Sequence, residues 1–380
     1  MKKNIVFLLG MAIVALFAVS GCGSKSKKIF DENGVRILDV KLDLTEPSID
    51  ELFSKCVPVQ LDSDPQCLIA RIGKTICVND SIIILDDSKS NVFLFSGDGD
   101  FLNQIGSKGK GPEEYYLCYY ITMSPDDAAI FLVNPMGELI KYDKTGKFID
   151  KKRLEGKPNY YACEMTEGDK MVIYSAVDID EAALMVANSS TGEISYEDWY
   201  DDPEINFQSP TPLYKYDGNI YFAAPFTTDV YEVGDSSLQL KYTWKLSPDG
   251  MIKEYLEDIR NMESRQEKNE RFNYDRVNGI IKDAPVFNAE TKKYYYLVLE
   301  TGYGEGSTRK SIFYDKDNDD YVVFTKFKEG ISFRPIFMND EYALCQVPYC
   351  EVETYNKLFG LNIECTGDEN PLLAKFYFKE

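Results

Sequence analysis

Residues 75–105 read TICVNDSIIILDDSKSNVFLFSGDGDFLNQI and contain four short apolar segments separated by turns. The first two segments, 75–78 and 81–85, are joined by Asn-Asp. The last two, 91–95 and 101–105, are joined by Ser-Gly-Asp-Gly. Asn, Asp and Gly accept the left-handed backbone conformations that tight hairpin turns require. The stretch therefore predicts a four-stranded antiparallel sheet in which each strand pairs with the one before it.

The same unit recurs along the chain. The glycines of its second hairpin, Gly99, Gly146 and Gly192, are 47 and 46 residues apart, and a fourth turn follows at 234–237. Two more copies follow, which makes six units. Six four-stranded units with alternating apolar residues and no strand-helix-strand pattern predict an all-β fold, a six-bladed β-propeller. A pair of β-sandwiches is the competing fold, but sandwiches show no repeat of this length.

The fifth unit begins about 35 residues late against this period, and the segment 249–283 accounts for the excess. Its apolar residues Ile252, Leu256, Ile259 and Met262 are spaced by four, three and three residues, as on one face of a helix. We therefore predict a short helical insertion between blades 4 and 5. We expect it to cover part of the face that carries a ligand site, with a purely packing role as the alternative.

A ring of blades has to be closed, and the sixth unit is one strand short. The extended segment 35–42 precedes the first unit. We predict that this N-terminal strand completes the last blade, because pairing the two chain ends removes exposed strand edges.

The N-terminus predicts a lipoprotein leader. Lys2 and Lys3 precede an apolar run at 5–19, and the run ends in Val-Ser-Gly before Cys22. This pattern is typical of a signal peptide, whereas a membrane-spanning helix usually needs about 18 or more apolar residues. We expect residues 1–21 to be removed, 22–34 to form the lipidated cysteine and a tether, and 35–380 to form the propeller. Two or more acyl chains on Cys22 would hold the protein stably at a membrane of the cell envelope, with the outer membrane favoured.

Charge and composition exclude several function classes. The net charge is −21, and removal of Lys2 and Lys3 with the leader makes it −23, so nucleic acids and anionic lipids are poor partners. The excess of acidic residues is better explained by solubility than by a site for cations. The chain contains no His, which excludes Ser-His-Asp and Cys-His nucleophiles and His-bound zinc. We expect no cofactor and no metal site.

Eight cysteines remain beside Cys22, at positions 56, 67, 77, 118, 163, 345, 350 and 365. An even number in an exported protein permits disulfides. The plausible local bridges are Cys56 with Cys67 and Cys345 with Cys350. We expect one or two disulfides at most, because several of the cysteines lie in apolar segments where a free thiol packs as a small hydrophobic group.

Two loops resemble ligand-binding motifs. The glycine-rich loop 106–115 lacks the Gly-Lys-Ser/Thr ending of a phosphate-binding loop and reads better as a crossover between blades. Asp315, Asp317 and Asp319 alternate like the start of a calcium loop, but Asp320 and Lys326 occupy the positions where Gly and Glu are required. We expect a solvated hairpin tip there.

Three stretches resemble the six-bladed β-propeller lipoproteins of anaerobic Gram-negative gut bacteria, distant relatives of NHL-repeat propellers. They are FSKCVPVQL at 53–61, the hairpin and crossover at 95–115, and Glu-Asn-Pro at 369–371. The family usually has Gly where this chain has Glu113. The resemblance implies the fold and an envelope location, and it brings no catalytic, cofactor or metal residues with it.

The leading functional hypothesis is a non-catalytic binding or scaffolding module for a glycan, peptide or protein partner. The alternative is an envelope enzyme, a glycosidase or lyase, that uses carboxylates and Tyr in the propeller channel. Tyr115, Tyr116, Tyr119 and Tyr120 are able to stack on a ligand, but such residues more often pack between blades.

Overall fold

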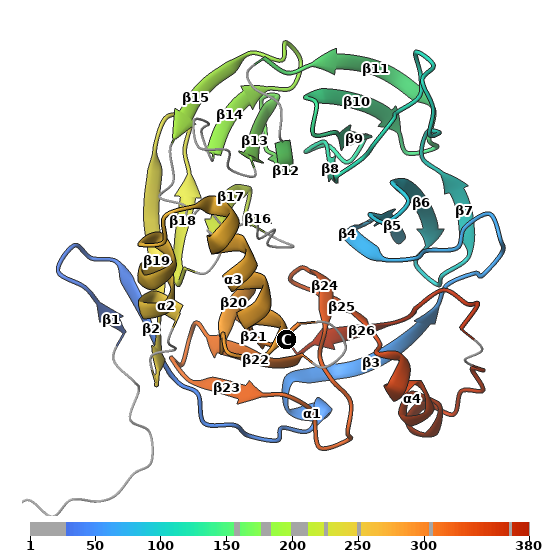
Figure 1. Cartoon of the computed structure of the whole chain (residues 1–380). Helices are drawn as coiled ribbons and strands as arrows, with labels where there is room; N and C mark the ends of the chain where they lie inside the picture. Colours follow the sequence, from blue (N-terminus) through green and yellow to red (C-terminus); the bar gives the residue numbers. More distant parts are fainter. Residues whose placement is uncertain are drawn as a thin grey trace, which may run out of the picture.

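The chain folds into a ring of six four-stranded antiparallel sheets around a central channel (Figure 1). A computed structural model describes residues 28–155, 160–175, 184–198, 212–223, 227–248, 252–303, 307–364 and 367–379. The leader and Cys22 lie outside the described residues. The predicted all-β, six-bladed propeller is therefore confirmed.

Each blade is a meander whose first strand lies innermost. Blade 1 contains β4 (Ile72–Val78), β5 (Ser81–Asp86), β6 (Asn91–Ser96) and β7 (Phe101–Gln104). Blade 2 contains β8 (Tyr120–Met123), β9 (Ala129–Val133), β10 (Glu138–Asp143) and β11 (Phe148–Arg153). Blade 3 contains β12 (Tyr160–Met165), β13 (Lys170–Ser175), β14 (Leu184–Asn188) and β15 (Ile194–Asp198).

The second half of the ring carries the additions. Blade 4 contains β16 (Leu213–Tyr216), β17 (Asn219–Ala223), β18 (Asp229–Val233) and β19 (Leu238–Ser247), with β2 (Arg36–Lys41) and β1 (Ile29–Phe30) added outside β19. Blade 5 contains β20 (Ala284–Glu290), β21 (Tyr294–Thr301), β22 (Thr308–Asp315) and β23 (Tyr321–Phe324). Blade 6 contains β24 (Pro335–Met338), β25 (Tyr342–Gln346), β26 (Leu372–Phe378) and β3 (Phe53–Gln60).

The repeated glycines have a structural reason beyond the hairpin turn. Gly99, Gly146 and Gly192 have φ angles of 104°, 81° and 84°, which strain any residue with a side chain. A Cβ atom on these glycines would lie 2.2, 2.7 and 2.5 Å from the backbone oxygens of Gln60, Gln104 and Arg153. These oxygens belong to the last residues of the outermost strands of the preceding blades. The glycine repeat therefore marks the contact where each hairpin meets the neighbouring blade.

The ring is closed by a different strand from the one predicted. β3 pairs with β26 in antiparallel register, with Val59 opposite Leu373, and completes blade 6. The segment 35–42, predicted to close the ring, instead contains β2, which pairs in parallel with β19 on blade 4. The sequence of β3 did not reveal its role, because Pro58 interrupts the pattern of a paired strand. Proline is tolerated at this position because β3 is the outermost strand of blade 6.

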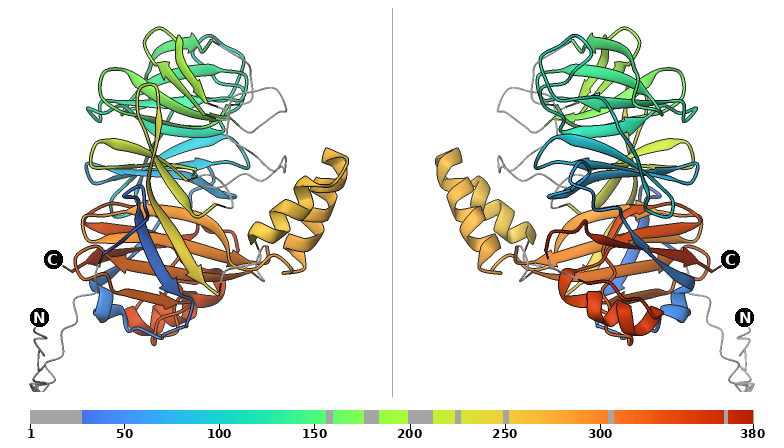
Figure 2. Two further views of the ribbon diagram at one scale, coloured as in Figure 1. Left: turned by 90° about the vertical axis from the view of Figure 1, so that its left-hand side faces the viewer. Right: turned by 90° about the vertical axis from the view of Figure 1, so that its right-hand side faces the viewer.

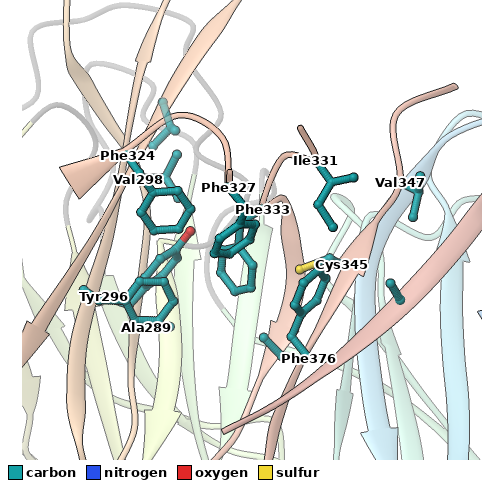
Figure 3. Close-up of a cluster of buried hydrophobic side chains, with 14 of the residues drawn as sticks. Ala289, Tyr296, Val298, Phe324, Phe327, Ile331, Phe333, Cys345, Val347 and Phe376 are labelled. Atoms are coloured by element: carbon teal, nitrogen blue, oxygen red, sulfur yellow. The ribbon is translucent and has the colours of Figure 1, made fainter. Parts of the chain in front are cut away.

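The largest hydrophobic cluster lies at this closure, between blades 5 and 6 (Figure 3). Phe53, the first residue of β3, is almost fully buried there and stacks on Phe333 at 5.3 Å between ring centroids. The ring of Phe376, on β26, packs edge-on against Phe333 at 5.4 Å. A short helix α1 (Ile49–Leu52) leads into β3, and blade 6 also carries the 3₁₀ turn η2 (Tyr349–Glu351) and the helix α4 (Val352–Phe359).

The insertion is a pair of helices, α2 (Ile252–Arg260) and α3 (Arg265–Val277), between β19 and β20. Figure 2 shows that the pair projects from one face of the ring. Leu256 and Ile259 are buried as predicted, and they pack with Phe272 of α3 against blade 5. Met262 is partly buried against the same cluster, and the side chain of Ile252 lies outside the described residues. No helix of the described residues is long and apolar enough to cross a membrane.

Candidate functional site

The ring has two chemically different faces. One face carries the connections from the second to the third strand of each blade, the crossovers between blades and the helical insertion; we call it the insert face. The opposite face carries the hairpins between first and second strands and between third and fourth strands; we call it the turn face. Because all blades share one meander, this division follows from the order of the strands alone.

Exposed large hydrophobic side chains gather on the insert face. They come from the crossover into blade 2, from blade 2 itself, from the helical pair and from blades 5 and 6: Tyr116, Tyr119, Met136, Tyr274, Val277, Ile280, Tyr303, Tyr349 and Leu358. The remaining ones lie at the rim of the ring: Ile29, Phe30, Leu44, Val57, Leu102 and Ile149. Among the described residues, none lies in a turn-face hairpin. Because the exposed apolar side chains gather on this face and are missing from the described turn-face hairpins, the insert face is the candidate binding surface.

The helical pair is held firmly at its base. The Arg276 guanidinium on α3 lies 3.2 Å from a carboxylate oxygen of buried Glu300, which also accepts a hydrogen bond from Arg309 at 2.9 Å. Arg276 also stacks over the exposed ring of Tyr303, 4.3 Å from its centroid. These contacts join α3 to β21 and β22 of blade 5, and they hold the ring of Tyr303 against Arg276.

The central channel contains a cavity of about 120 Å³. All six innermost strands contribute to its wall, which is lined by Lys74, Thr75, Ile76, Met123, Glu164, Leu213, Tyr214, Lys215, Phe287, Asn288, Ala289, Glu290, Ile336, Phe337 and Met338. An innermost strand pairs with a neighbour on one side only, so part of its backbone faces the channel unpaired. The wall combines apolar side chains with polar and charged groups, among them two lysines and two carboxylates.

The first buried charged group of the channel joins blades 1, 3 and 4. Glu164 of β12 forms an ion pair with Lys74 of β4 and accepts a hydrogen bond from Thr122 of β8 at 2.9 Å. Lys215 of β16 lies 3.7 Å from the other carboxylate oxygen. Burial opposes both charges, but the ion pair outweighs it, so the pKa of Glu164 is held below and that of Lys74 above its usual range.

The second group lies between blades 4 and 5. Lys316 donates to Glu290 of β20 at 2.6 Å, and the hydroxyl of Tyr214 lies 3.5 Å from the other carboxylate oxygen. Burial dominates here, so it raises the pKa of Glu290 and lowers that of Lys316. Tyr214 is also hydrogen-bonded to Tyr242 at 2.7 Å, which fixes its position in the wall.

These networks do not favour the enzyme alternative. The carboxylate of Glu164 contacts two ammonium groups and a hydroxyl. In this environment the carboxylate has no proton to donate and is too weakly basic to accept one. Burial raises the pKa of Tyr120 and Tyr214, so neither phenol is available as a base near neutral pH. Glu164 therefore serves as a structural partner of the two lysines.

The four tyrosines singled out in the sequence divide into two groups. Tyr115 and Tyr120 are buried between blades, whereas Tyr116 and Tyr119 are exposed on the insert face. In the loop 106–115, the Glu114 carboxylate accepts a hydrogen bond from the backbone N–H of Gly111 at 2.7 Å. An acidic group thus occupies the donor that an anion would use, in keeping with a crossover.

The alternating aspartates form a hairpin tip that is only partly solvated. Asp315 accepts hydrogen bonds from the backbone N–H groups of Asp317 and Asn318, at 2.9 and 3.0 Å, and thereby closes the turn. Asp319 is buried in an ion pair with Arg36 of β2, which connects blade 5 to the strand added to blade 4. The expectation of a fully solvated tip was wrong because the sequence does not reveal where β2 packs.

Neither local disulfide is formed in the structure. Seven cysteines are free, namely Cys56, Cys67, Cys77, Cys118, Cys163, Cys345 and Cys350, and Cys365 lies outside the described residues. Cys345 is buried on β25 whereas Cys350 is exposed beyond it, so the two thiols occupy different environments.

The sequence missed Lys74, Glu164 and Lys215 because the three residues meet only where separate blades converge on the channel.

The fold and the channel place this protein in the class of six-bladed β-propellers. The family model described as "Domain of unknown function (DUF4934)" matches residues 35–376, and the chain belongs to this family. No curated protein matches the sequence.

One of the similar solved structures supports the fold. A "Putative exported protein" from Bacteroides fragilis NCTC 9343 is 19% identical with a TM-score of 0.71, covering 90% of this chain and 100% of that chain. A structural genomics protein of unknown function from Bacteroides thetaiotaomicron VPI-5482 is 12% identical with a TM-score of 0.44, covering 88% of this chain and 75% of that one. At these identities the likeness concerns the fold alone.

Proposed function

We propose that this protein is an envelope lipoprotein, anchored through an acylated Cys22, whose insert face binds a partner protein without catalysis. The observation that carries the proposal is the uneven distribution of exposed apolar side chains, which occupy the insert face and are missing from the described hairpins of the turn face. Tyr and Arg are enriched at protein interfaces, and Tyr274, Tyr303, Tyr349 and Arg276 supply both on this face.

A protein or peptide suits this surface better than a glycan. The exposed side chains come from blades as far apart in the ring as blade 2 and blade 5, and from helices that project from the face (Figure 2). A sugar-binding site needs only a few stacked aromatic rings in one place, whereas a protein interface spreads over 20 to 30 residues, on the order of 800 Å² a side. The width of the distribution therefore favours a protein.

The membrane anchor is supported by the leader pattern before Cys22 and by the resemblance to propeller lipoproteins with NHL-like blades. The description of the Bacteroides fragilis neighbour as exported supports an envelope location, with the outer membrane favoured. Two acyl chains suffice for stable anchoring, so the insert face would meet only partners of the same compartment.

Site-specific photo-crosslinking in the bacterium that produces the protein tests the binding proposal. A photoreactive phenylalanine replaces Tyr274 or Tyr349 on the insert face, and Lys144, exposed in a turn-face hairpin, is the matched control position. We expect discrete protein adducts from the first two positions and none from Lys144. Equal adducts from all three positions would contradict the face assignment, and an adduct that resists protease but is cleaved by glycosidases would replace the protein partner with a glycan.

Labelling with a fatty-acid analogue tests the anchor. The wild type should incorporate the label and stay in the membrane fraction, whereas Cys22→Ser should lose the label with the propeller still folded. Persistent labelling of Cys22→Ser would show that the lipid is attached elsewhere.

A further inference from the structure

The channel cavity is lined by two lysines, Lys74 and Lys215, and by two carboxylates, Glu164 and Glu290. Lys316 pairs with Glu290 from outside the lining. The lysines of the wall therefore balance its carboxylates, although the whole chain carries a net charge of −21.

Lys215 is the group with spare capacity. Its ion-pair partner among the described residues is Glu164 at 3.7 Å, longer than a hydrogen bond, whereas Lys74 approaches the same carboxylate closely. The side chain of Lys215 is 40% exposed, so the charged end of the cavity is in contact with solvent at this point. An ammonium group has three donors, and this one is not saturated by the protein.

Two neutral side chains of the wall carry donors toward the cavity. The hydroxyl of Thr75, a residue 2% exposed, has no hydrogen-bond partner. The indole N–H of Trp244 donates to Oδ1 of Asn288 at 3.3 Å, and because indole is only a donor, this contact does not use the Nδ2 group of Asn288. Buried polar groups are normally paired, so the orphaned hydroxyl of Thr75 in the cavity wall indicates a partner that completes it.

We propose that the cavity binds the carboxylate of an organic acid, with Lys215 as its charged partner and Asn288 and Thr75 as additional donors. The apolar residues of the wall, with Phe287 and Met338 among them, would contact an aliphatic or aromatic body. The volume of about 120 Å³ is several times the roughly 10–15 Å³ that one water requires, which suits a short acyl chain or one terminal side chain.

This site is separate from the proposed interface. Glu164, Glu290 and Met338 lie at or near the ends of their innermost strands, next to the turn face, whereas the helical pair enters β20 at its beginning. The carboxylate comes either from a free small acid or from the C-terminus of a peptide. Both sources present the same group to Lys215, and the inference does not depend on the partner of the insert face.

Intrinsic fluorescence provides a direct readout because Trp244 contacts the wall through Asn288. The chain has two Trp residues, so Trp199→Phe leaves Trp244 as the single emitter. Purified protein carrying this substitution is titrated with hexanoate, and hexanamide serves as the uncharged analogue. A second arm compares an acetylated tripeptide ending in Leu with a free C-terminus against the same peptide amidated. We expect saturable changes with hexanoate or the free-acid peptide, and none with the two amides.

Lys215→Met tests the charged partner and keeps most of the side-chain length. Lys245→Met is the matched control, because Lys245 is on the same blade, is 65% exposed and forms an ion pair with Asp39 at 2.8 Å. Removing a charge-assisted contact should weaken binding about tenfold or more in Lys215→Met and leave Lys245→Met unchanged.

The outcomes separate clearly. Binding of hexanoate assigns the site to small acids, and binding of the free-acid peptide alone assigns it to chain termini. Binding of the amides as tightly as the acids, an unchanged affinity in a folded Lys215→Met, or no response to either acid would overturn the proposal. If Lys215→Met is unstable, the comparison of acids with amides in the protein that retains Lys215 still decides whether the cavity binds a carboxylate. The crosslinking result on the insert face is unaffected by any of these outcomes.

Discussion

Closure of the ring by β3 predicts a large loss of stability for Phe53→Ala. Phe53 is 1% exposed, and its ring centroid lies 5.2 Å from Phe376 and 5.3 Å from Phe333. Removing a buried Phe side chain costs about 3–5 kcal/mol, which includes aromatic pairs worth about 0.5–1.5 kcal/mol each. We therefore expect about 4 kcal/mol, a large fraction of the roughly 5–15 kcal/mol by which native proteins are stable.

Urea denaturation followed by circular dichroism measures this effect. The midpoint of Phe53→Ala should fall with little change in slope, because the folded ring itself is retained. Val57→Ala on the same strand is the control, since Val57 is 38% exposed and its loss should cost about 1 kcal/mol or less. A loss below about 1 kcal/mol for Phe53→Ala, or equal losses for both variants, would refute the view that this side chain secures the closing strand.

Three further predictions follow from the channel, the thiols and the insertion. Glu164→Gln should lower the free energy of unfolding at pH 7 by about 3–5 kcal/mol, because Lys74 stays buried without its carboxylate. The folded-state pKa of Glu164 is depressed, so its stabilisation is present above the unfolded pKa of about 4.3 and is lost as the pH falls through the folded value. Glu164→Gln should therefore lose less stability than the wild type over that acid range. An equal loss in both proteins would contradict the pairing of Glu164 with Lys74. Without reductant, a thiol reagent should label Cys350 in the native protein and Cys163 only after unfolding, and mass spectrometry that finds either in a disulfide would contradict the structure. Replacing 249–283 by a Gly/Ser linker should preserve the β-rich circular dichroism spectrum and weaken the crosslink from Tyr349, whereas an unfolded ring would identify the helical pair as core structure.

The blades were predictable because they depend on local sequence. Hairpins form where Asn, Asp or Gly adopts positive φ, and the structure has Asp80, Asp127, Asp169 and Asp217 in that conformation at the first hairpins of blades 1 to 4. The insertion was visible as an interruption of the repeat, and its buried positions Leu256 and Ile259 followed from helical spacing. Its division into two helices was not predicted, because α3 is mainly polar and shows no clear apolar stripe.

The closure was predicted in principle and assigned to the wrong strand. Both 35–42 and 53–60 precede the first blade, and the first has the clearer alternation of apolar and polar residues. Alternation reports that one face of a strand is buried, and Leu38 and Val40 of β2 are indeed buried against blade 5. It does not report which edge the strand joins, since parallel pairing to β19 and antiparallel pairing to β26 satisfy the same pattern.

By itself, the sequence determined the number of blades, the position of the insertion and the absence of histidine chemistry, because each depends on local spacing or on composition. Only the tertiary structure decided which strand closes the ring, which face gathers the exposed tyrosines, and that Lys74, Glu164 and Lys215 meet in the channel. These three residues are far apart in the chain and belong to blades 1, 3 and 4. Their meeting depends on the curvature that brings all innermost strands to one axis, and that curvature arises from the packing of whole blades against one another.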